Sequence, residues 1–295
     1  MGSKKTTNSR DAPEQVLQVS MDEIHPFKNH PFKVLDDEMM QQTVDSIKQV
    51  GILNPTIIRP DPDGGYEMIS GHRRMHAAEL AGFKTLPALV RNLTNDEAVM
   101  LMVDSNLQRE SISPMEQAYA YKMKLEALRH QGKRVEATSP QLGQKSAWAV
   151  TRVAEDAGSS RSQVQRFIRL TDLNPALQEM VNSKKIAVSP AVELSFLSEE
   201  EQKQVLDAME YSQNTPSLSQ AQKLKKLSKE GKCTQAAMYA IMSEEKKPVD
   251  NRSVILPSDT IRRYFPKNFS KRQVEETIIK LLQEWQKKRQ RQKER

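Results

Sequence analysis

With 295 residues, the chain is long enough for two or three domains that each have a core. Its 45 Lys and Arg residues outnumber 38 Asp and Glu, and the net charge of +7 favours a polyanionic partner. The single cysteine, Cys233, excludes an intrachain disulfide and a cysteine-rich zinc site, and no apolar run approaches the ~20 residues that cross a bilayer. We therefore expect a soluble, cytoplasmic protein.

The first 15 residues are polar and basic and have no hydrophobic period, which predicts a disordered arm. A first domain is expected over residues 16–110. It should open with a strand at residues 16–19 and a proline-punctuated loop at residues 25–33. A helix capped by Asp36 or Asp37 follows, and Gly51 ends it. Its buried face is expected to consist of Met40, Val44 and Ile47.

Residues 52–59 and 66–70 alternate as strands around an Asp-Pro-Asp-Gly-Gly turn, so a hairpin is expected. Gly71 ends the second strand, and a short helix follows it up to Gly82. Arg73 and Arg74 therefore occupy a helix N-terminus, where the helix dipole and two guanidinium groups together favour an anion. The alternative is a solvated basic helix start, with one arginine paired to a local carboxylate such as Glu79.

A further strand is expected at residues 85–90, and Thr94 and Glu97 have the spacing of a capping box. The helix that follows is apolar at residues 98–103, so it should be buried, and it carries Asn106 and Arg109 at its end. Three or four short strands with intervening helices predict a small α+β domain with a mixed sheet.

Residues 111–242 have helical periodicity outside residues 133–147 and predict an all-α domain. Ser113 and Glu116 form a capping box for a helix that should reach residue 132, while residues 133–147 are interpreted as a loop or an irregular approach to the next helix. Residues 151–170 have helix-turn-helix spacing, with a turn at Gly158. The second helix should turn six polar residues outward to DNA, namely Arg161, Ser162, Gln163, Gln165, Arg166 and Arg169. The alternative is an ordinary surface helix.

Short helices are expected at residues 173–182, 189–197, 199–209 and 217–228, and their lysines are interpreted as solvated unless they touch phosphate. Residues 243–253 predict a charged linker. The last segment, residues 254–295, is a basic helical region whose final 25 residues hold nine Lys or Arg and four Glu. One face of its helix carries Val274, Ile278, Leu281, Leu282 and Trp285. That stripe favours pairing with a second copy or docking onto the chain's own domains.

Three segments in this order resemble motifs of the ParB/RepB/Spo0J family of plasmid and chromosome partition proteins. They are Gly51-Ile52-Leu53-Asn54-Pro55, Gly71-His72-Arg73-Arg74 and Asn106-Leu107-Gln108-Arg109. The resemblance implies that they line a site for cytidine triphosphate (CTP) and that a helix-turn-helix behind them reads a centromere-like DNA repeat. The nucleotide-binding residues would then be Lys33, Gly51, Pro55, Gly71, His72, Arg73, Arg74, Asn106 and Arg109. A Mg²⁺ ion bound with the triphosphate would take an oxygen ligand from Asn106 or Asp104.

The chain departs from the family pattern at three positions. Phe32-Lys33 stands where the family usually has an arginine that reaches the nucleotide, and a lysine supplies charge without the planar fork. Ser105 stands where a glutamate commonly assists hydrolysis, and His72 where glutamate is more frequent. These departures leave phosphate binding intact but predict slow or absent CTP hydrolysis, below about 1 per second.

The resemblance implies a DNA-binding partition protein that works as a homodimer on a palindromic, centromere-like site in the nucleoid. The basic arm, through Lys4, Lys5 and Arg10, would contact a ParA-like ATPase or serve only as a solubilising tail. Two other hypotheses stay open. One is a transcriptional repressor that uses its first domain for dimer contacts, and the other is a nuclease that would depend on His72 and His76.

Overall fold

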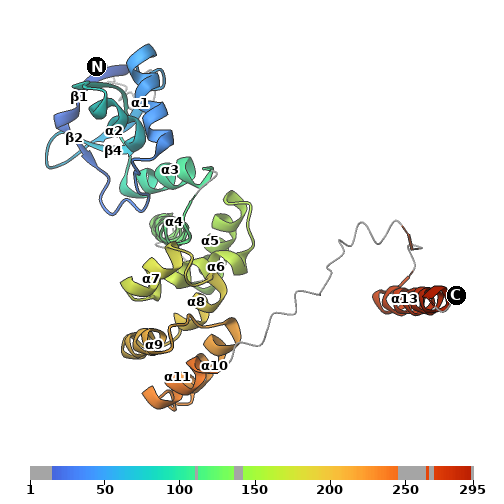
Figure 1. Cartoon of the computed structure of the whole chain (residues 1–295). Coiled ribbons are helices and arrows are strands. Elements are labelled where there is room, and N and C mark those ends of the chain that lie inside the picture. Colours follow the sequence, from blue (N-terminus) through green and yellow to red (C-terminus); the bar gives the residue numbers. More distant parts are fainter. Residues whose placement is uncertain (1–14, 110–111, 136–141, 245–263, 266–268, 294–295) are drawn as a thin grey trace, which may run out of the picture. The chain divides into compact units, whose positions relative to one another are not determined.

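The computed structural model describes residues 15–109, 112–135, 142–244, 264–265 and 269–293 (Figure 1). The chain divides into two compact units, Met1–Glu244 and Glu245–Arg295. All but the last residue of the predicted basic arm lies outside the described ranges. The same holds for the predicted linker, of which only residues 243 and 244 are described.

The first domain is built on a five-stranded mixed sheet with the order β1-β5-β3-β4-β2. Its strands are β1 Val16–Ser20, β2 Ile24–Pro26, β3 Thr56–Pro60, β4 Tyr66–Ser70 and β5 Thr85–Val90. β3 and β4 form the expected antiparallel hairpin, whereas β3 with β5 and β2 with β4 are parallel. Three or four strands were expected, but the sheet has five. The additional strand is β2, which lies in the proline-punctuated segment. Pro26 cannot donate a ladder hydrogen bond, but β2 is an edge strand, where a proline is tolerated.

Helices α1 Glu38–Val50, α2 His72–Leu80 and α3 Asn95–Leu107 complete this domain, with a short 3₁₀ turn, η1, at Met21–Glu23. Two predicted N-terminal caps are confirmed. The side chain of Asp37 accepts from the Met40 N–H at 2.8 Å, and Thr94 forms a reciprocal capping box with Glu97. The predicted apolar face of α1 is buried and packs against Ala77 of α2. Because α1 and α2 are packed together, the residue that caps α1 lies beside the start of α2.

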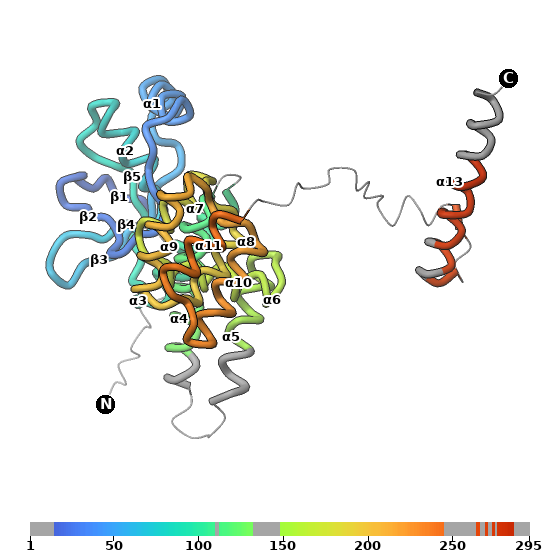
Figure 2. The backbone as a smooth tube through the Cα atoms, turned by 60° about the horizontal axis from the view of Figure 1, so that its bottom comes forward, coloured from blue at the N-terminus to red at the C-terminus, as the bar shows by residue number. Residues whose placement is uncertain are grey.

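The second domain is helical, as expected, and α4 joins it to the first (Figure 2). Its elements are α4 Pro114–Val135, α5 Leu142–Asp156, α6 Arg161–Arg169, η2 Leu170–Asp172, α7 Pro175–Asn182, α8 Val188–Leu194, α9 Glu199–Ser212, α10 Leu218–Lys229 and α11 Gln235–Met242. Residues 133–147 were interpreted as a loop or an irregular approach to the next helix. The loop alternative was wrong for the described part of this segment, because α4 continues to Val135 and α5 already begins at Leu142.

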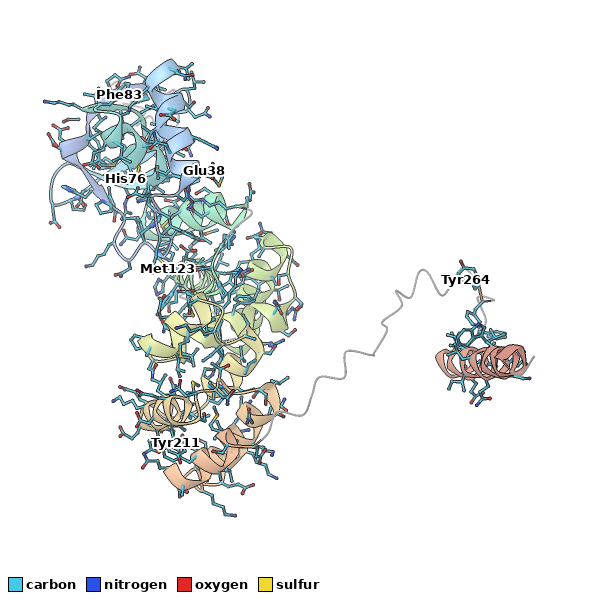
Figure 3. All side chains as sticks on the ribbon, in the orientation of Figure 1. Glu38, His76, Phe83, Met123, Tyr211 and Tyr264 are labelled. Carbon is cyan, nitrogen blue, oxygen red and sulfur yellow. The ribbon has the colours of Figure 1, made fainter. Side chains whose placement is uncertain are left out.

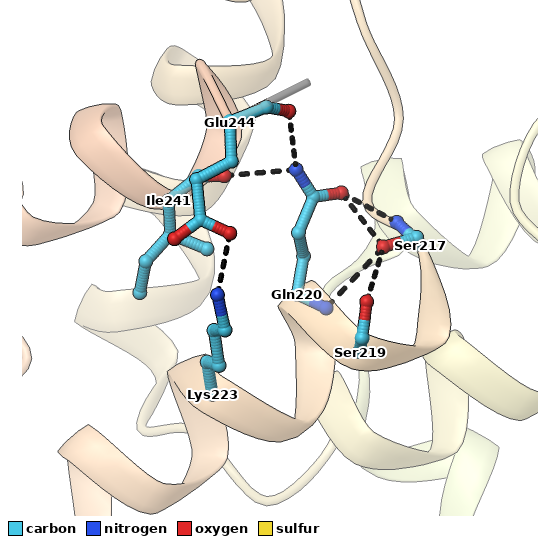
Figure 4. A network of polar contacts seen from close by, with 6 residues as sticks. All are labelled: Ser217, Ser219, Gln220, Lys223, Ile241 and Glu244. Atoms are coloured by element: carbon cyan, nitrogen blue, oxygen red, sulfur yellow. Dashed lines mark hydrogen bonds and ion pairs between the residues drawn. The ribbon is translucent and has the colours of Figure 1, made fainter. Parts of the chain in front are cut away.

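A polar network fastens the end of this domain (Figure 4). Gln220 completes a capping box with Ser217 at the start of α10, and its Nε2 donates to the carbonyl oxygen of Ile241 in α11 at 2.8 Å. An ion pair between Lys223 and Glu244 lies beside it. The fold of the first unit therefore continues to Glu244, close to the end that the periodicity indicates.

The second unit contains one long described helix, α13 Lys271–Lys293. Leu281, Leu282 and Trp285 on the predicted apolar stripe are 57–59% exposed. Within the described ranges, no helix has both the length and the apolar character needed to cross a bilayer.

Candidate functional site

Gly71 sets the geometry at the start of α2. Its φ of +115° is a left-handed conformation that L side chains rarely adopt. A Cβ atom on this residue would lie 2.6 Å from Cγ2 of Thr56, which is fully buried at the start of β3. Only glycine therefore allows the chain to leave β4 and enter α2 this close to β3.

Arg74 ties the start of α2 to the loop formed by residues 51–55. Its Nη1 donates to the carbonyl oxygen of Pro55 at 2.8 Å and also to that of Asn54. Burial lowers the pKa of this guanidinium from its usual value. Two of the three sequence motifs are thus in direct contact, and Arg74 uses part of its hydrogen-bonding capacity to hold them together.

Arg73, in contrast, forms an ion pair with a partly exposed carboxylate. Its Nη2 lies 2.8 Å from Oδ1 of Asp37, and its side chain is 30% exposed. The sequence had suggested Glu79 as the local partner, but Glu79 lies beside His76 instead, with 3.7 Å between its Oε2 and Nδ1 of His76. The Met40 N–H and then Arg73 lower the pKa of Asp37.

A cavity of about 410 Å³ lies next to the two arginines. Its walls come from α1, including Gln42 and Ser46, from the loop at residues 51–54, and from Arg73 and Arg74. This volume falls within the range of pockets that hold small molecules. Gly51, with φ of +73°, ends α1 and turns the chain along the cavity wall.

Arg109 lies in a second group of side chains with His72 and the segment that contains Phe32. Its guanidinium is 6.0 Å from the centroid of the buried Phe32 ring. The rings of His72 and His30 are in contact, with their centroids 3.9 Å apart and their planes inclined at 39°. The charges of Arg73 and Arg109 also act on each other, and burial followed by this repulsion lowers the pKa of Arg109. A multiply charged anion would relieve that repulsion.

Lys33 is exposed, and its backbone N–H donates to Oε1 of Glu116 in α4 at 2.7 Å. Of the two residues, Phe32 is buried, whereas Lys33 lies at the surface. This hydrogen bond holds the loop that contains Lys33 against α4. Glu116 also accepts a hydrogen bond from the Ser113 N–H at the start of that helix.

Asn106 is buried near the end of α3, and its Nδ2 donates to the Met102 carbonyl oxygen at 2.8 Å. Its Oδ1 is covered and has no hydrogen-bond partner within the described part of the chain. A carbonyl oxygen in this state suits a Mg²⁺ ligand or an N–H acceptor. Among the described residues, no group of three or more His, Cys, Asp or Glu side chains could hold a metal ion. A Mg²⁺ ion bound here would therefore take most of its oxygen ligands from the bound molecule rather than from protein side chains.

Asp104, the alternative metal ligand, has a partner that the sequence did not suggest. Lys124 of α4 is fully buried, and its Nζ binds both Asp104 of α3 and Oδ2 of Asp156 at the end of α5, the latter at 2.8 Å. One ammonium group thus links the end of the first domain to the first helix of the helix-turn-helix. A sequence signal exists, because Lys124 falls on the same helix face as Tyr121, Leu125 and Leu128.

The helix-turn-helix consists of α5 and α6. Ser160 Oγ accepts from the Gln163 N–H at 3.2 Å, and Val164 and Phe167 are buried against the domain core. Five of the six residues expected to face DNA are exposed, namely Arg161, Ser162, Gln163, Gln165 and Arg166. Arg166 also donates to Ser189 Oγ of α8 at 2.9 Å.

Arg169 differs from the expectation that it turns outward. Its Nη1 is 3.0 Å from Oδ2 of Asp172, and its Nη2 donates to the Ser195 carbonyl oxygen at 3.2 Å. The guanidinium also lies 4.3 Å from the centroid of Phe196. Arg169 therefore connects the end of α6 with the turn that follows α8, while 39% of its side chain stays exposed.

The two histidines on which a nuclease hypothesis depends have separate partners. His76, labelled on α2 in Figure 3, has its Nε2 2.7 Å from Oδ1 of Asp36. The ring of His72 contacts that of His30, and burial lowers the pKa of His72 to about 3, with added effects of His30 and Arg109. Each imidazole is thus held by its own neighbours.

Two family models match adjacent parts of the chain. The ParB N-terminal domain matches residues 5–107, and the ParB HTH domain matches residues 110–215. The chain is 34% identical to the chromosome-partitioning protein Spo0J of Thermus thermophilus over 63% of its own length and 62% of the relative's. It is 30% identical to the probable chromosome-partitioning protein ParB of Vibrio cholerae over 71% of this chain and 65% of the relative. The chain thus covers less than two thirds of the length of these relatives.

A structural likeness was also found to the C-terminally truncated chromosome-partitioning protein ParB from Caulobacter crescentus complexed with CTP-gamma-S. It has 26% sequence identity and a TM-score of 0.31, and covers 65% of this chain and 99% of that chain.

Proposed function

Because the chain belongs to the ParB family, with that family's N-terminal domain followed by its HTH domain, we propose that it is a partition protein that binds a centromere-like DNA site and uses CTP as a switch. The proposal that the chain binds CTP rests on the contact between the sequence motifs. Arg74 holds the loop at residues 51–55 against the start of α2. Arg109 lies close enough to His72 to lower its pKa, and the pKa of Arg109 is itself lowered by Arg73.

In this proposal the triphosphate is held by Arg73 and Arg109, since Arg74 is already bound to the loop carbonyls. Charge-assisted contacts from two guanidinium groups suit phosphate oxygens. The cavity beside Arg73 would accept the remainder of the nucleotide. Asn106 would supply an oxygen to Mg²⁺, and the ion would neutralise phosphate charge. With Ser105 and His72 in the positions of two glutamates, the chain acts as a switch with slow turnover rather than as an efficient hydrolase.

The DNA part of the proposal assigns base reading to the exposed face of α6. Arg166 is its central cation, and Arg161 with Gln165 extends the same exposed surface. Arginine and glutamine side chains pair with guanine and adenine edges in the major groove. Arg169 would act indirectly, because it holds α6 in place.

Replacing Arg166 with alanine is expected to weaken binding to the cognate duplex by about 1–3 kcal/mol, the typical discrimination of one bidentate base contact. Fluorescence anisotropy with cognate and unrelated duplexes measures this effect. Lys184→Ala, a basic surface residue in the loop after α7, serves as a control and should cost much less. An equal loss on both duplexes for Arg166→Ala would identify a phosphate contact instead of a base contact.

We also propose that α13 pairs with α13 of a second copy, so that two reading heads span a palindromic site. Its exposed Leu281, Leu282 and Trp285 lie on a helix that is otherwise charged. Deleting residues 254–295 is expected to convert dimers to monomers in sedimentation velocity of the DNA-free, nucleotide-free protein. A truncated chain that still sediments as a dimer would refute this assignment.

Other partners follow from the same proposal. A ParA-like ATPase would contact the basic arm, and DNA binding would place the protein on the nucleoid in the cytoplasm. A site on a plasmid and a site on a chromosome would be bound through the same contacts. A transcriptional repressor is the alternative, and it would give a DNA footprint that CTP does not change.

A further inference from the structure

His30 and His72 form a close, tilted pair of rings that the sequence motifs do not predict. His30 comes from the loop after β2 and His72 from the first turn of α2, and their ring centroids are 3.9 Å apart. The Nε2 atoms of both rings are covered and have no hydrogen-bond partner within the described ranges. Leaving two such nitrogens unsatisfied costs free energy, which a bound ligand can recover.

The protonation state of His30 follows from its other nitrogen. Nδ1 lies 2.8 Å from the carbonyl oxygen of Phe32, which can only accept a hydrogen bond. Nδ1 therefore carries the proton of the neutral ring, and Nε2 carries a lone pair. A lone pair repels a phosphate oxygen, so Nε2 of His30 can bind phosphate only after the ring gains a second proton.

The charges around the pair keep it neutral in this state. Burial is the largest cause in both rings, lowering the pKa of His30 and bringing that of His72 to about 3. A charge on His30, and after it Arg109, lowers the pKa of His72 further. At His30, the hydrogen bond to the Phe32 carbonyl oxygen raises the pKa, Arg109 lowers it and Glu116 of α4 raises it. Arg73 in turn acts on Arg109. A triphosphate at Arg73 and Arg109 would reverse the sign of this field.

We infer that His30 and His72 are part of the nucleotide site and that they bind the triphosphate as imidazolium groups, so that nucleotide binding is coupled to proton uptake. This inference rests on the proposed CTP site.

The sign of the pH dependence follows from linkage. If the complex holds more protons than the free protein, affinity rises as pH falls, by up to about tenfold per pH unit for each proton taken up. The effect begins below the pKa of the imidazoles in the complex. It continues down toward the pKa of the free protein, about 3 for His72.

Calorimetric titration of the full chain with CTP and Mg²⁺ tests the inference, at pH 8 and pH 6 in pairs of buffers that differ in ionisation enthalpy. The comparison chain is His30→Gln/His72→Gln, which keeps polar side chains but cannot be protonated. Protonation of CTP itself contributes equally to both chains and cancels. His130→Gln, an exposed histidine of α4 paired with Asp96, is the matched control.

We expect the parent and His130→Gln to take up at least half a proton more than the double variant at pH 6. Their gain in affinity between pH 8 and pH 6 should exceed that of the double variant by at least about fivefold. Equal proton uptake in all three chains would overturn the inference while leaving the CTP site in place. No binding by the parent at either pH would instead overturn the proposed function, and this inference with it.

If the double variant does not fold, long-range ¹H–¹⁵N spectra of the parent imidazoles give the same answer. The ring nitrogens of His30 and His72 should shift to imidazolium values at pH 6 only when CTP is added. Spectra of neutral rings in the CTP complex would overturn the inference.

Discussion

Replacing both Asp104 and Asp156 with asparagine is expected to destabilise the helical domain by about 3–5 kcal/mol, because the buried ammonium of Lys124 loses both countercharges. The Lys124 side chain is fully buried, whereas those of Asp104 and Asp156 are 47% and 23% exposed. Water can therefore solvate the two carboxylates but not the ammonium. Urea unfolding followed by circular dichroism measures the change in free energy of unfolding.

The control is Lys124→Met, which removes the buried charge and keeps a side chain of similar length. Its cost should be clearly smaller, since the two carboxylates that it leaves without Lys124 are 47% and 23% exposed and can be solvated. Combining it with Asp104→Asn and Asp156→Asn should recover much of the stability that the double asparagine variant loses. A larger loss for Lys124→Met than for the double asparagine variant would contradict this account.

Replacing Arg73 with alanine is expected to weaken CTP binding by about 10- to 100-fold, or about 1.5–3 kcal/mol, the range for a hydrogen bond to a charged group. Thermal unfolding should change little, because its one ion pair, to Asp37, is partly exposed. Arg74→Ala should lower both affinity and melting temperature, since this side chain holds the loop at residues 51–55. Calorimetry and a thermal scan on the two variants separate these effects.

Asp37→Asn is the matched control for Arg73. Asparagine can still cap α1 at Met40, but it releases the Arg73 guanidinium from its ion pair. We expect CTP affinity to stay equal or to rise. A loss of affinity as large as that of Arg73→Ala would mean that the ion pair with Asp37, rather than phosphate binding, explains the role of Arg73.

The sequence was most informative where local chemistry decides the structure. The caps at Asp37 and Thr94, the β3–β4 hairpin and the position of Gly71 all follow from residues close together in the chain. Their physical reasons, an oxygen facing a free N–H or a φ that only glycine tolerates, act over a few residues.

The sequence was least informative where a partner lies far away in the chain. β2 is a strand only because β4 supplies its ladder. Arg169 looked like a DNA-facing residue by its position on α6, but Asp172 and the Ser195 carbonyl hold it. The contact between the rings of His30 and His72 likewise needs the loop after β2 to meet α2.

The central claim is that residues 71–74, Asn106 and Arg109 form a triphosphate site coupled to the reading helix α6. Calorimetry of the full chain with each of the four ribonucleoside triphosphates, with and without a centromere-like duplex, tests it most directly. The account predicts that CTP binds with the highest affinity and that the duplex changes this affinity. The absence of measurable affinity for any of the four nucleotides, with DNA present or absent, would contradict it.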